Sequence, residues 1–206
     1  MKTDVSEYLQ TICRFVLILL TTCCLFSCNA DKPGNPKVEI ETKFGTIVVE
    51  LYPAQATLTV AAFLRYVDSG YYKKSAFYRV LTEENQSSES FKSELIQGGI
   101  WESNNKLAIS LPGTPHESTE KSAILHKDGV ISMARTDTGT ANTEFFICVG
   151  DQHGLDYGGK RNPDGQGFAS FGKVIRGQDI VRRIHKQPEL NESFDPLVTI
   201  INIRRK

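Results

Sequence analysis

Arg79, Gln97 and Phe146 are the strongest candidates in this chain for a shared functional site. Each lies in a short, largely apolar segment that is expected to form a strand. A guanidinium stays charged at every working pH, and an amide can both donate and accept hydrogen bonds. One fixed cation and one amide beside an apolar wall predict a site for an uncharged, partly apolar substrate.

The cysteine and histidine residues do not suggest a second chemistry. Cys148 lies in the apolar run 145–149 and is interpreted as a buried structural thiol rather than a nucleophile. The 4 histidines are too far apart for helical ligand pairs, and no His or Cys spacing predicts a zinc site. The glycine-rich segment 151–167 lacks the alternating acidic positions of a calcium loop. We therefore expect no metal site and no cofactor.

The candidate residues lie in a part of the chain that is expected to form mostly short strands. Strands are expected over 38–42, 46–51, 76–81, 95–97, 130–135, 144–149, 168–175 and 198–204, and helices over 57–69 and 178–185. The first two strands flank a turn with Gly45, which can adopt the positive φ of a hairpin. Closing such strands into a barrel would leave no exposed strand edge, and the two helices would cap its ends, so the sequence predicts a mainly β fold of this kind.

The N-terminal segment predicts export. Residues 15–27 are uncharged, follow Lys2 and Arg14, and are shorter than the ~20 apolar residues of a membrane-spanning helix. The run ends in Leu25-Phe26-Ser27-Cys28, which resembles the lipobox of bacterial lipoproteins, where the Cys thiol takes a diacylglyceryl group and becomes the new N-terminus. A plain secretory signal and a short buried helix remain alternatives.

The sequence therefore divides into a signal peptide at 1–27, a lipid-anchored flexible tether at 28–36 and one folded domain at 37–206. Acyl chains on Cys28 would hold the domain at a membrane of the bacterial cell envelope, facing the periplasm. Of the 5 cysteines only Cys148 lies in the domain, so no disulfide is expected there.

Charge limits the partners of the domain. The predicted signal peptide carries two basic and two acidic residues, so 22 of each remain in the rest of the chain and the net charge stays zero. A protein that binds nucleic acid needs an excess of positive charge against the phosphates. We therefore expect no nucleic-acid partner, and we expect a monomer.

The order of short motifs along 38–204 resembles the cyclophilin family of peptidyl-prolyl cis-trans isomerases. The matching motifs are Phe-x-Arg-Val, Gln-Gly-Gly, Ser-Met-Ala-Arg, Phe-Phe-Ile and Phe-Gly-Lys-Val. The resemblance implies an eight-stranded antiparallel barrel with two capping helices, a packed interior and an outer groove that binds an Xaa-Pro segment. The sequence variants Phe-Tyr-Arg-Val and Pro-His-Glu-Ser-Thr look closer to those of bacterial exported members than to those of eukaryotic cytosolic members.

The resemblance also implies roles for individual groove residues. The catalytic positions are Arg79 and Gln97, and the substrate-binding positions are Leu95, Met133, Ala134, Glu144, Phe146, Leu155 and Phe168. Leu95, Phe146 and Leu155 would form the walls of the proline pocket. Met133 would lie behind them, although by itself it favours a core position. The backbone of Ala134 would pair with the residues that precede the proline.

Four positions depart from the family pattern: Glu94 replaces a large apolar residue, Gly154 an aromatic one, Glu144 a glutamine and Phe168 a histidine. The groove is therefore expected to be shallower and more acidic. Glu144 could pair with Arg79 and compete with substrate, or it could favour basic residues before the proline. Three aromatic residues could replace the lost surface: Phe91, Trp101 and Tyr157.

The implied reaction is rotation about an Xaa-Pro amide bond, whose barrier of ~18–20 kcal/mol comes from conjugation of the nitrogen lone pair. In the twisted transition state the proline nitrogen is pyramidal, so a donor aimed at its lone pair binds that state better than the planar one. Arg79 is the candidate donor. Gln97 would orient it by accepting a hydrogen bond, while the Gln97 amide binds substrate backbone.

Two functions agree with these residues, and both take proline-containing polypeptides as partners. One is an isomerase that accelerates Xaa-Pro rotation in exported proteins, where proline steps limit folding. The other is a non-catalytic chaperone or assembly module that uses the same groove. The combination of Arg79, Gln97 and Phe146 favours the enzyme, whereas Glu94 and Gly154 leave the binding module open.

Overall fold

The computed structural model describes residues 34–88 and 91–206. The predicted signal peptide at 1–27, Cys28 and most of the predicted tether therefore lie outside the described residues. The part of the chain from Asn35 to Lys206 forms one compact unit.

All the strands and helices expected from the sequence are present, some with shifted ends. The strands are β1 (Lys37–Thr42), β2 (Gly45–Leu51), β3 (Ser75–Leu81), β4 (Leu95–Gly99), β5 (Val130–Met133), β6 (Phe145–Cys148), β7 (Ala169–Arg176), β8 (Glu189–Leu190) and β9 (Ser193–Arg205). The helices are α2 (Thr57–Asp68), α3 (Trp101–Ser110), α4 (Thr119–Ser122) and α5 (Gln178–His185), with a 3₁₀ turn, η1 (His153–Leu155).

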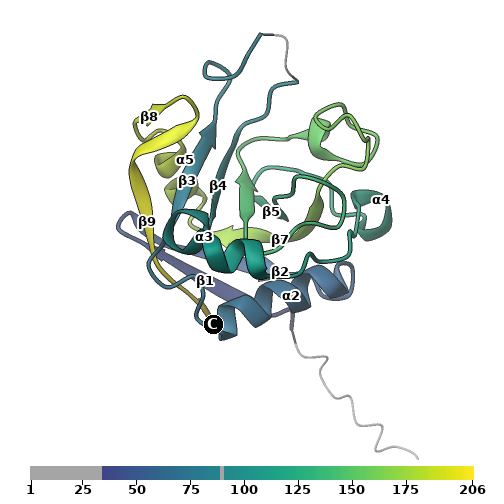
Figure 1. Ribbon diagram of the computed structural model, residues 1–206, viewed down its shortest axis with the longest axis horizontal. Coiled ribbons are helices and arrows are strands. Elements are labelled where there is room, and N and C mark those ends of the chain that lie inside the picture. Colours follow the sequence, from purple (N-terminus) through teal and green to yellow (C-terminus); the bar gives the residue numbers. More distant parts are fainter. Residues whose placement is uncertain (1–33, 89–90) are drawn as a thin grey trace, which may run out of the picture. The chain divides into compact units, whose positions relative to one another are not determined.

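Eight of the strands close into a barrel. Their order is β1-β2-β7-β5-β6-β4-β3-β9, and β9 pairs back with β1, with every neighbouring pair antiparallel (Figure 1). The short β8 pairs with β9 outside this ring. Because closure leaves no free edge in the ring, the prediction of a closed eight-stranded antiparallel barrel is confirmed.

The first hairpin forms at the predicted turn. Thr42 pairs with Gly45, and the Thr42 hydroxyl accepts a hydrogen bond from the Phe44 N–H at 3.1 Å. Gly45 has a φ of +130°, and a Cβ built there would lie 2.6 Å from Cδ1 of Ile180. Glycine is therefore required at this turn both for backbone conformation and for the close approach of α5.

The two expected helices pack against the barrel from different sides (Figure 1). In α2 the apolar residues recur at helical spacing, and Phe63 is fully buried in the barrel interior. In α5 the buried residues are Val181 and Ile184, one helical turn apart. Helix α2 contacts β9 and β7, whereas α5 contacts β2 and β4.

Two further helices were not expected. Helix α3 buries only Ala108, and its dihedral angles leave the helical region at Asn104, where φ is −158° and ψ is 67°. Helix α4 has 4 residues, too few to show a period. Neither segment carries the repeating apolar face from which a helix is predicted, so the sequence indicated only α2 and α5.

The last strand is longer than expected. It begins at Ser193 rather than at 198 and carries Pro196 in its interior. Because proline cannot donate a backbone hydrogen bond, it argues against a strand in a sequence pattern. This explains why the first part of β9 was missed.

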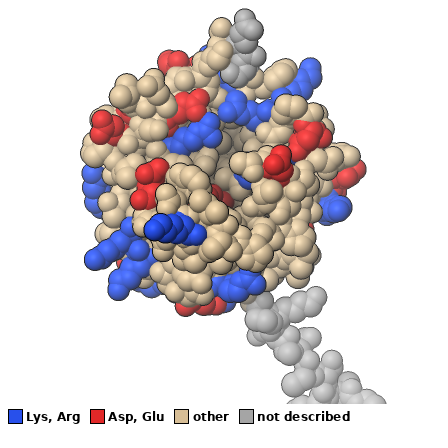
Figure 2. Space-filling model, in the orientation of Figure 1, with Lys and Arg blue, Asp and Glu red and all other residues tan. Residues whose placement is uncertain are grey.

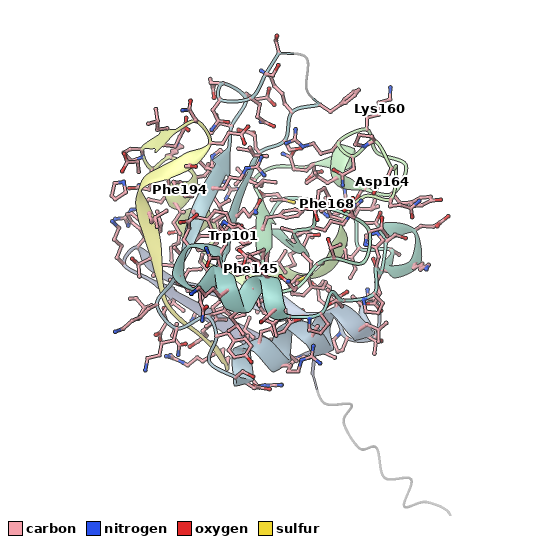
Figure 3. All side chains as sticks on the ribbon, viewed as in Figure 1. Trp101, Phe145, Lys160, Asp164, Phe168 and Phe194 are labelled. Carbon is pink, nitrogen blue, oxygen red and sulfur yellow. The ribbon has the colours of Figure 1, made fainter. Side chains whose placement is uncertain are left out.

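The buried apolar residues form two clusters on opposite faces of the barrel wall. The larger one, here the interior core, contains Phe145, which packs edge-to-face against Phe63, Tyr72 and Phe77 at ring-centroid distances of 5.8, 5.7 and 5.8 Å. The smaller one, here the outer cluster, consists of Leu81, Leu95, Phe146, Cys148 and Leu155. Figure 3 marks Phe145 of the core and Phe168, which packs on the outer cluster.

Candidate active site

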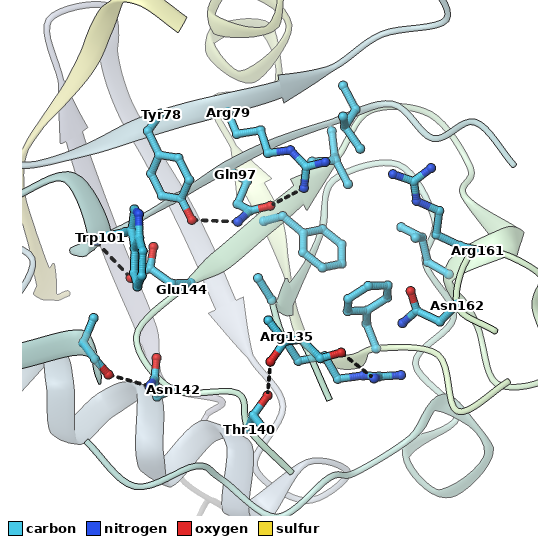
Figure 4. A pocket seen from close by; sticks show the side chains of 18 of the residues that line it. Tyr78, Arg79, Gln97, Trp101, Arg135, Thr140, Asn142, Glu144, Arg161 and Asn162 are labelled. Atoms are coloured by element: carbon cyan, nitrogen blue, oxygen red, sulfur yellow. Dashed lines mark hydrogen bonds between the residues drawn. The ribbon is translucent and has the colours of Figure 1, made fainter. Parts of the chain in front are cut away.

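A pocket of about 520 Å³ opens beside the outer cluster. Figure 2 shows this face hollowed between side chains of both charges. The ends of β3 and β4 supply one wall and the segments after β5 and before β6 another, while α3 and the loop around η1 close the sides (Figure 4). A volume of this size is typical of small-ligand sites.

Arg79 on β3 is held from two sides. Strand register places it opposite Gln97 on β4, and its Nη1 donates to the Gln97 Oε1 at 3.4 Å. Its Nε and Nη2 both donate to Oε2 of Glu192, at 3.0 and 2.6 Å. A guanidinium has five N–H groups, and these bonds use three. One N–H on Nη1 and one on Nη2 therefore remain for a substrate.

Gln97 links Arg79 to Tyr78. Its Nε2 donates to the Tyr78 hydroxyl at 2.6 Å, while its Oε1 faces Arg79. The Arg79 contact fixes which way the amide points, because a guanidinium can only donate, whereas the Tyr78 hydroxyl can donate or accept. The described residues leave the second N–H of Nε2 without a partner, so the predicted contact with substrate backbone stays a prediction.

Glu144 lies next to this chain of hydrogen bonds but does not pair with Arg79. Its Oε1 accepts from the N–H groups of Ile100 and Trp101 at 2.9 and 3.2 Å, and from the Thr143 hydroxyl at 3.0 Å. Its Oε2 is buried without a regular hydrogen bond in the described part of the chain. The ion pair considered for Glu144 and Arg79 is made instead by Glu192.

Burial sets the protonation of this corner of the pocket. It raises the pKa of Glu144, against the opposing effect of the Tyr78 and Thr143 hydroxyls and the two backbone N–H groups. Burial also raises the pKa of Tyr78, with a smaller contribution from the charge of Glu144. Tyr78 is therefore a neutral phenol at every working pH.

The apolar side of the pocket is built by the outer cluster. Leu95, Phe146 and Leu155 line it together with Phe168, whose ring stands edge-to-face to Phe146 at 5.2 Å and 88°. Ala134 also lines the pocket. The four larger side chains together form an apolar slot on this side of the pocket.

A buried polar network supports the Phe146 wall from behind. The His126 ring stacks on Phe146 at 5.9 Å and 18°. Its Nδ1 lies 2.8 Å from Asp156 Oδ1, and its Nε2 lies 3.0 Å from the Ser132 hydroxyl. Burial would raise the pKa of Asp156, but the hydrogen bonds from His126 outweigh it and lower that pKa. Because neither His126 nor Ser132 is among the residues that line the pocket, the network is a support.

The predicted site residues thus converge on one pocket, with one exception. The residues that line it are Arg79, Gln97, Leu95, Ala134, Glu144, Phe146, Leu155 and Phe168. Met133 is not among the lining residues and belongs to the interior core. Successive side chains of a strand point to opposite faces, so Met133 points inward while Ser132 points outward. Of the aromatic residues considered as replacements, Trp101 lines the pocket, whereas Phe91 and Tyr157 do not.

Two residues of the Arg79 network were missed by the sequence analysis. Glu192 lies 113 positions from Arg79 in the chain, in the turn between β8 and β9, so only the fold brings them together. Tyr78 is adjacent to Arg79, and its position before the cation was the available signal. The catalytic role of the network remains a prediction.

The described residues contain no group of three or more His, Cys, Asp or Glu side chains placed to hold a metal ion. Across residues 34–88 and 91–206, none of the helices has the length and apolar character needed to cross a membrane. Cys148 is a buried free thiol, and burial raises its pKa well above the usual value.

Curated proteins similar to this chain are peptidyl-prolyl cis-trans isomerases by name. Isomerase cyp18 of Streptomyces antibioticus is 36% identical over 148 residues, which cover 71% of this chain and 81% of that protein. The isomerase of Acinetobacter baylyi is 32% identical over 161 residues, 78% of this chain and 77% of that protein. Isomerase A of Dickeya dadantii is 32% identical and covers 81% of this chain and 83% of its own length.

A solved structure and a family model extend the comparison. A cyclophilin-type isomerase of Cryptosporidium parvum has the same fold, with a TM-score of 0.64 and 21% identity over 84% of this chain and 98% of that one. The model of the family described as cyclophilin type peptidyl-prolyl cis-trans isomerase matches residues 37–205. The chain therefore belongs to the cyclophilin-type peptidyl-prolyl cis-trans isomerase family, as its motifs predicted.

Proposed function

We propose that the chain catalyses cis-trans isomerisation of Xaa-Pro bonds during the folding of exported proteins. The observation that supports this most directly is Arg79, held by Gln97 and Glu192 at the edge of an apolar slot, with two N–H groups left for substrate. Such a site can bind a proline ring and place a fixed donor at its nitrogen.

The reaction needs only positioning and electrostatics. The slot beside Phe146 and Phe168 holds the ring, and the free N–H of Gln97 binds a neighbouring carbonyl. Rotation of the amide turns the nitrogen lone pair outward, where the remaining donors of Arg79 stabilise it. Because Arg79 is already held before substrate arrives, little reorganisation is needed in the transition state. No proton is transferred, so we expect the rate to be nearly flat between about pH 6 and 8.

An isomerisation assay on short Xaa-Pro peptides tests the proposal. The wild-type chain should accelerate the cis-to-trans step, and it should also accelerate refolding of a protein that is limited by proline isomerisation. Lys121→Ala is the control for variants of Arg79 and should keep wild-type activity, because this cation is exposed and does not line the pocket. Peptide binding without acceleration would instead support the non-catalytic chaperone or assembly module.

We also propose that the enzyme works at the bacterial cell envelope as a lipoprotein facing the periplasm. The support is the sequence Leu25-Phe26-Ser27-Cys28 after an uncharged apolar run. In a bacterial host the wild-type chain should partition into detergent and take up labelled lipid, whereas Cys28→Ala should not be labelled. A soluble periplasmic protein with another new N-terminus would contradict the anchor but leave the isomerase intact, since the pocket lies within residues 78–168.

A further inference from the structure

The pocket has a second compartment beyond the apolar slot. Trp101, Ala108 and Ile109 of α3 line it together with Asn142 and Glu144, and the Trp101 N–H donates to Glu144 Oε1 at 3.2 Å. Figure 3 shows Trp101 and Phe168 well apart on this face, so the two aromatic rings belong to different parts of the pocket. Helix α3 therefore adds a binding surface that the proline slot does not use.

Glu144 gives this compartment a negative charge that no cation neutralises. Among the described residues no ion pair involves Glu144, although its Oε1 accepts three hydrogen bonds. The nearby guanidinium of Arg135 is paired with Asp164 at 2.8 Å, and Arg79 is paired with Glu192. Its charge is therefore unpaired at the pocket wall and can attract a cation that enters the pocket, even though Oε2 itself is buried.

The phenols nearest to Glu144 do not change this charge. Tyr72 and Tyr78 both have a raised pKa, mainly through burial and to a lesser extent through the charge of Glu144 itself. Both therefore remain neutral phenols at working pH. Apart from the two guanidinium groups already paired, the groups facing Glu144 thus leave its charge uncompensated.

The other wall of the compartment suits the aliphatic part of a long basic side chain. Trp101 is 44% exposed and Ile109 is 70% exposed, although both line a pocket. An exposed indole face attracts a cation, and an aliphatic neighbour covers the methylene groups that carry it. Together with the acid behind Trp101, these surfaces match lysine or arginine better than any neutral residue.

The opposite end of the pocket carries the opposite charge. Arg161 lies across the pocket from Trp101 and Glu144 (Figure 4). Burial, followed by the charge of Arg79, lowers the pKa of Arg161. A basic side chain entering at that end would be repelled, so the pocket distinguishes the two sides of a bound proline.

We propose that the compartment formed by Trp101, Ile109 and Glu144 binds the basic side chain of a residue that precedes the proline. This rests on the proposed function, which places the proline in the slot. Ala134, whose backbone is expected to pair with the residues before proline, donates its N–H to the Glu144 carbonyl at 2.9 Å. Substrate residues that pair with the backbone at Ala134 therefore lie next to Glu144.

Matched peptides test the preference. Peptides with Lys, Ala or Glu at each of the two positions before proline are compared in affinity and in kcat/KM. In the wild type we expect Lys to exceed Glu by about tenfold at one of these positions, with the ratio falling as salt is added. In Glu144→Gln the ratio should fall to about twofold or less. Glu102→Gln is the control, because this exposed acid of α3 does not line the pocket, and it should keep the wild-type ratio.

Each outcome separates the two proposals. A Lys-to-Glu ratio near one in the wild type, or an unchanged ratio in Glu144→Gln, would overturn the basic compartment while activity on all peptides still supported the isomerase. A Lys preference in binding without acceleration of any peptide would keep the compartment and reject the isomerase. If Glu144→Gln does not fold, the salt dependence of the wild-type ratio decides, because a neutral compartment would give a ratio that salt does not change.

Discussion

Phe145 and Phe146 are adjacent in β6 and have different surroundings. Phe145 points into the barrel and meets three aromatic rings of the interior core. Phe146 points outward, where its ring meets Phe168 on the pocket side and His126 behind. Both are almost fully buried, at 0% and 2% exposure, so burial alone does not reveal which one is available to a ligand. The side chains that surround each ring show that only Phe146 borders the pocket.

The difference shows how one strand serves stability and binding together. The inner face is covered by other apolar side chains of the interior core. The outer face is covered only in part, and the gap is the pocket. A buried His126–Asp156 pair backs this outer wall, which keeps it in place without filling the slot. The binding wall is therefore supported by a polar network, whereas the inner face is supported by apolar packing.

Truncation of the two rings should separate the faces most strongly. Phe145→Ala should lower the free energy of unfolding by ~3–5 kcal/mol, because a large cavity forms in a closed core. Phe146→Ala should cost less stability, since water can enter the space from the pocket, but it should weaken peptide binding and activity together. Urea unfolding and the peptide assay measure the two effects. Equal stability losses, or binding that survives in Phe146→Ala, would contradict the division.

Removal of the cation should have the next largest effect. Arg79→Ala should lower kcat/KM by about 10²-fold with an intact fold, the usual loss for one preorganised donor. Arg79→Lys should also be impaired, because an ammonium lacks the planar fork that engages Gln97 and Glu192 together. Wild-type activity in Arg79→Ala would remove this residue from the mechanism.

Glu192 tests whether the hold on Arg79 matters apart from the cation itself. Glu192→Ala should lower kcat by about tenfold, because the guanidinium loses its partner and must be ordered during the reaction. Its KM should change little, since Glu192 is not among the residues that line the pocket. Glu192→Gln can still accept a hydrogen bond and should recover part of the loss. A change confined to KM, or no rescue by Gln, would argue against a positioning role.

The fold was predictable wherever one face of an element is buried. Alternation in the strands separated Phe145 from Phe146, and the apolar spacing of α2 defined a helix. Helix α3 could not be predicted in this way, because it buries only Ala108 and bends at Asn104. Most of its side chains face the pocket or solvent, so apolar residues do not recur along it at helical spacing.

The candidate site was predictable where its residues share neighbouring strands. Arg79 and Gln97 lie in motifs that pair in register, so a sequence could bring them together. Glu192 comes from a turn near the other end of the chain and carries no local signal. Met133 shows the converse, because a motif placed it at the pocket while the strand period turns it into the core. Motifs thus indicate which segments lie together at the pocket. The alternation of side chains along each strand decides which of their residues face it.

The smallest expected effect concerns the charge of Glu144, and it appears in stability rather than in rate. The pKa of Glu144 is raised in the folded state by burial, from an ordinary value of 4.5. A raised folded pKa means that the folded protein binds this proton more tightly than the unfolded chain does. The stability that it contributes is therefore fully present below about pH 4.5 and is lost as the pH rises through the folded value.

Glu144→Gln should remove this loss, because an amide can accept the same hydrogen bonds at Oε1 without a charge to desolvate. The second oxygen, Oε2, is replaced by an NH₂ group that can donate a hydrogen bond to the Tyr78 oxygen. The variant thus removes a buried acceptor that makes no regular hydrogen bond. Such an acceptor costs on the order of 1–3 kcal/mol, so we expect the variant to gain about 1 kcal/mol at pH 7.5 and close to nothing at pH 4. The difference between variant and wild type in urea unfolding at the two pH values isolates this group from the carboxylates with lowered pKa, such as Asp164. A difference that does not change with pH would mean that Glu144 is no more costly to ionise in the fold than in the unfolded chain, and that the acidic compartment is better hydrated than its burial indicates.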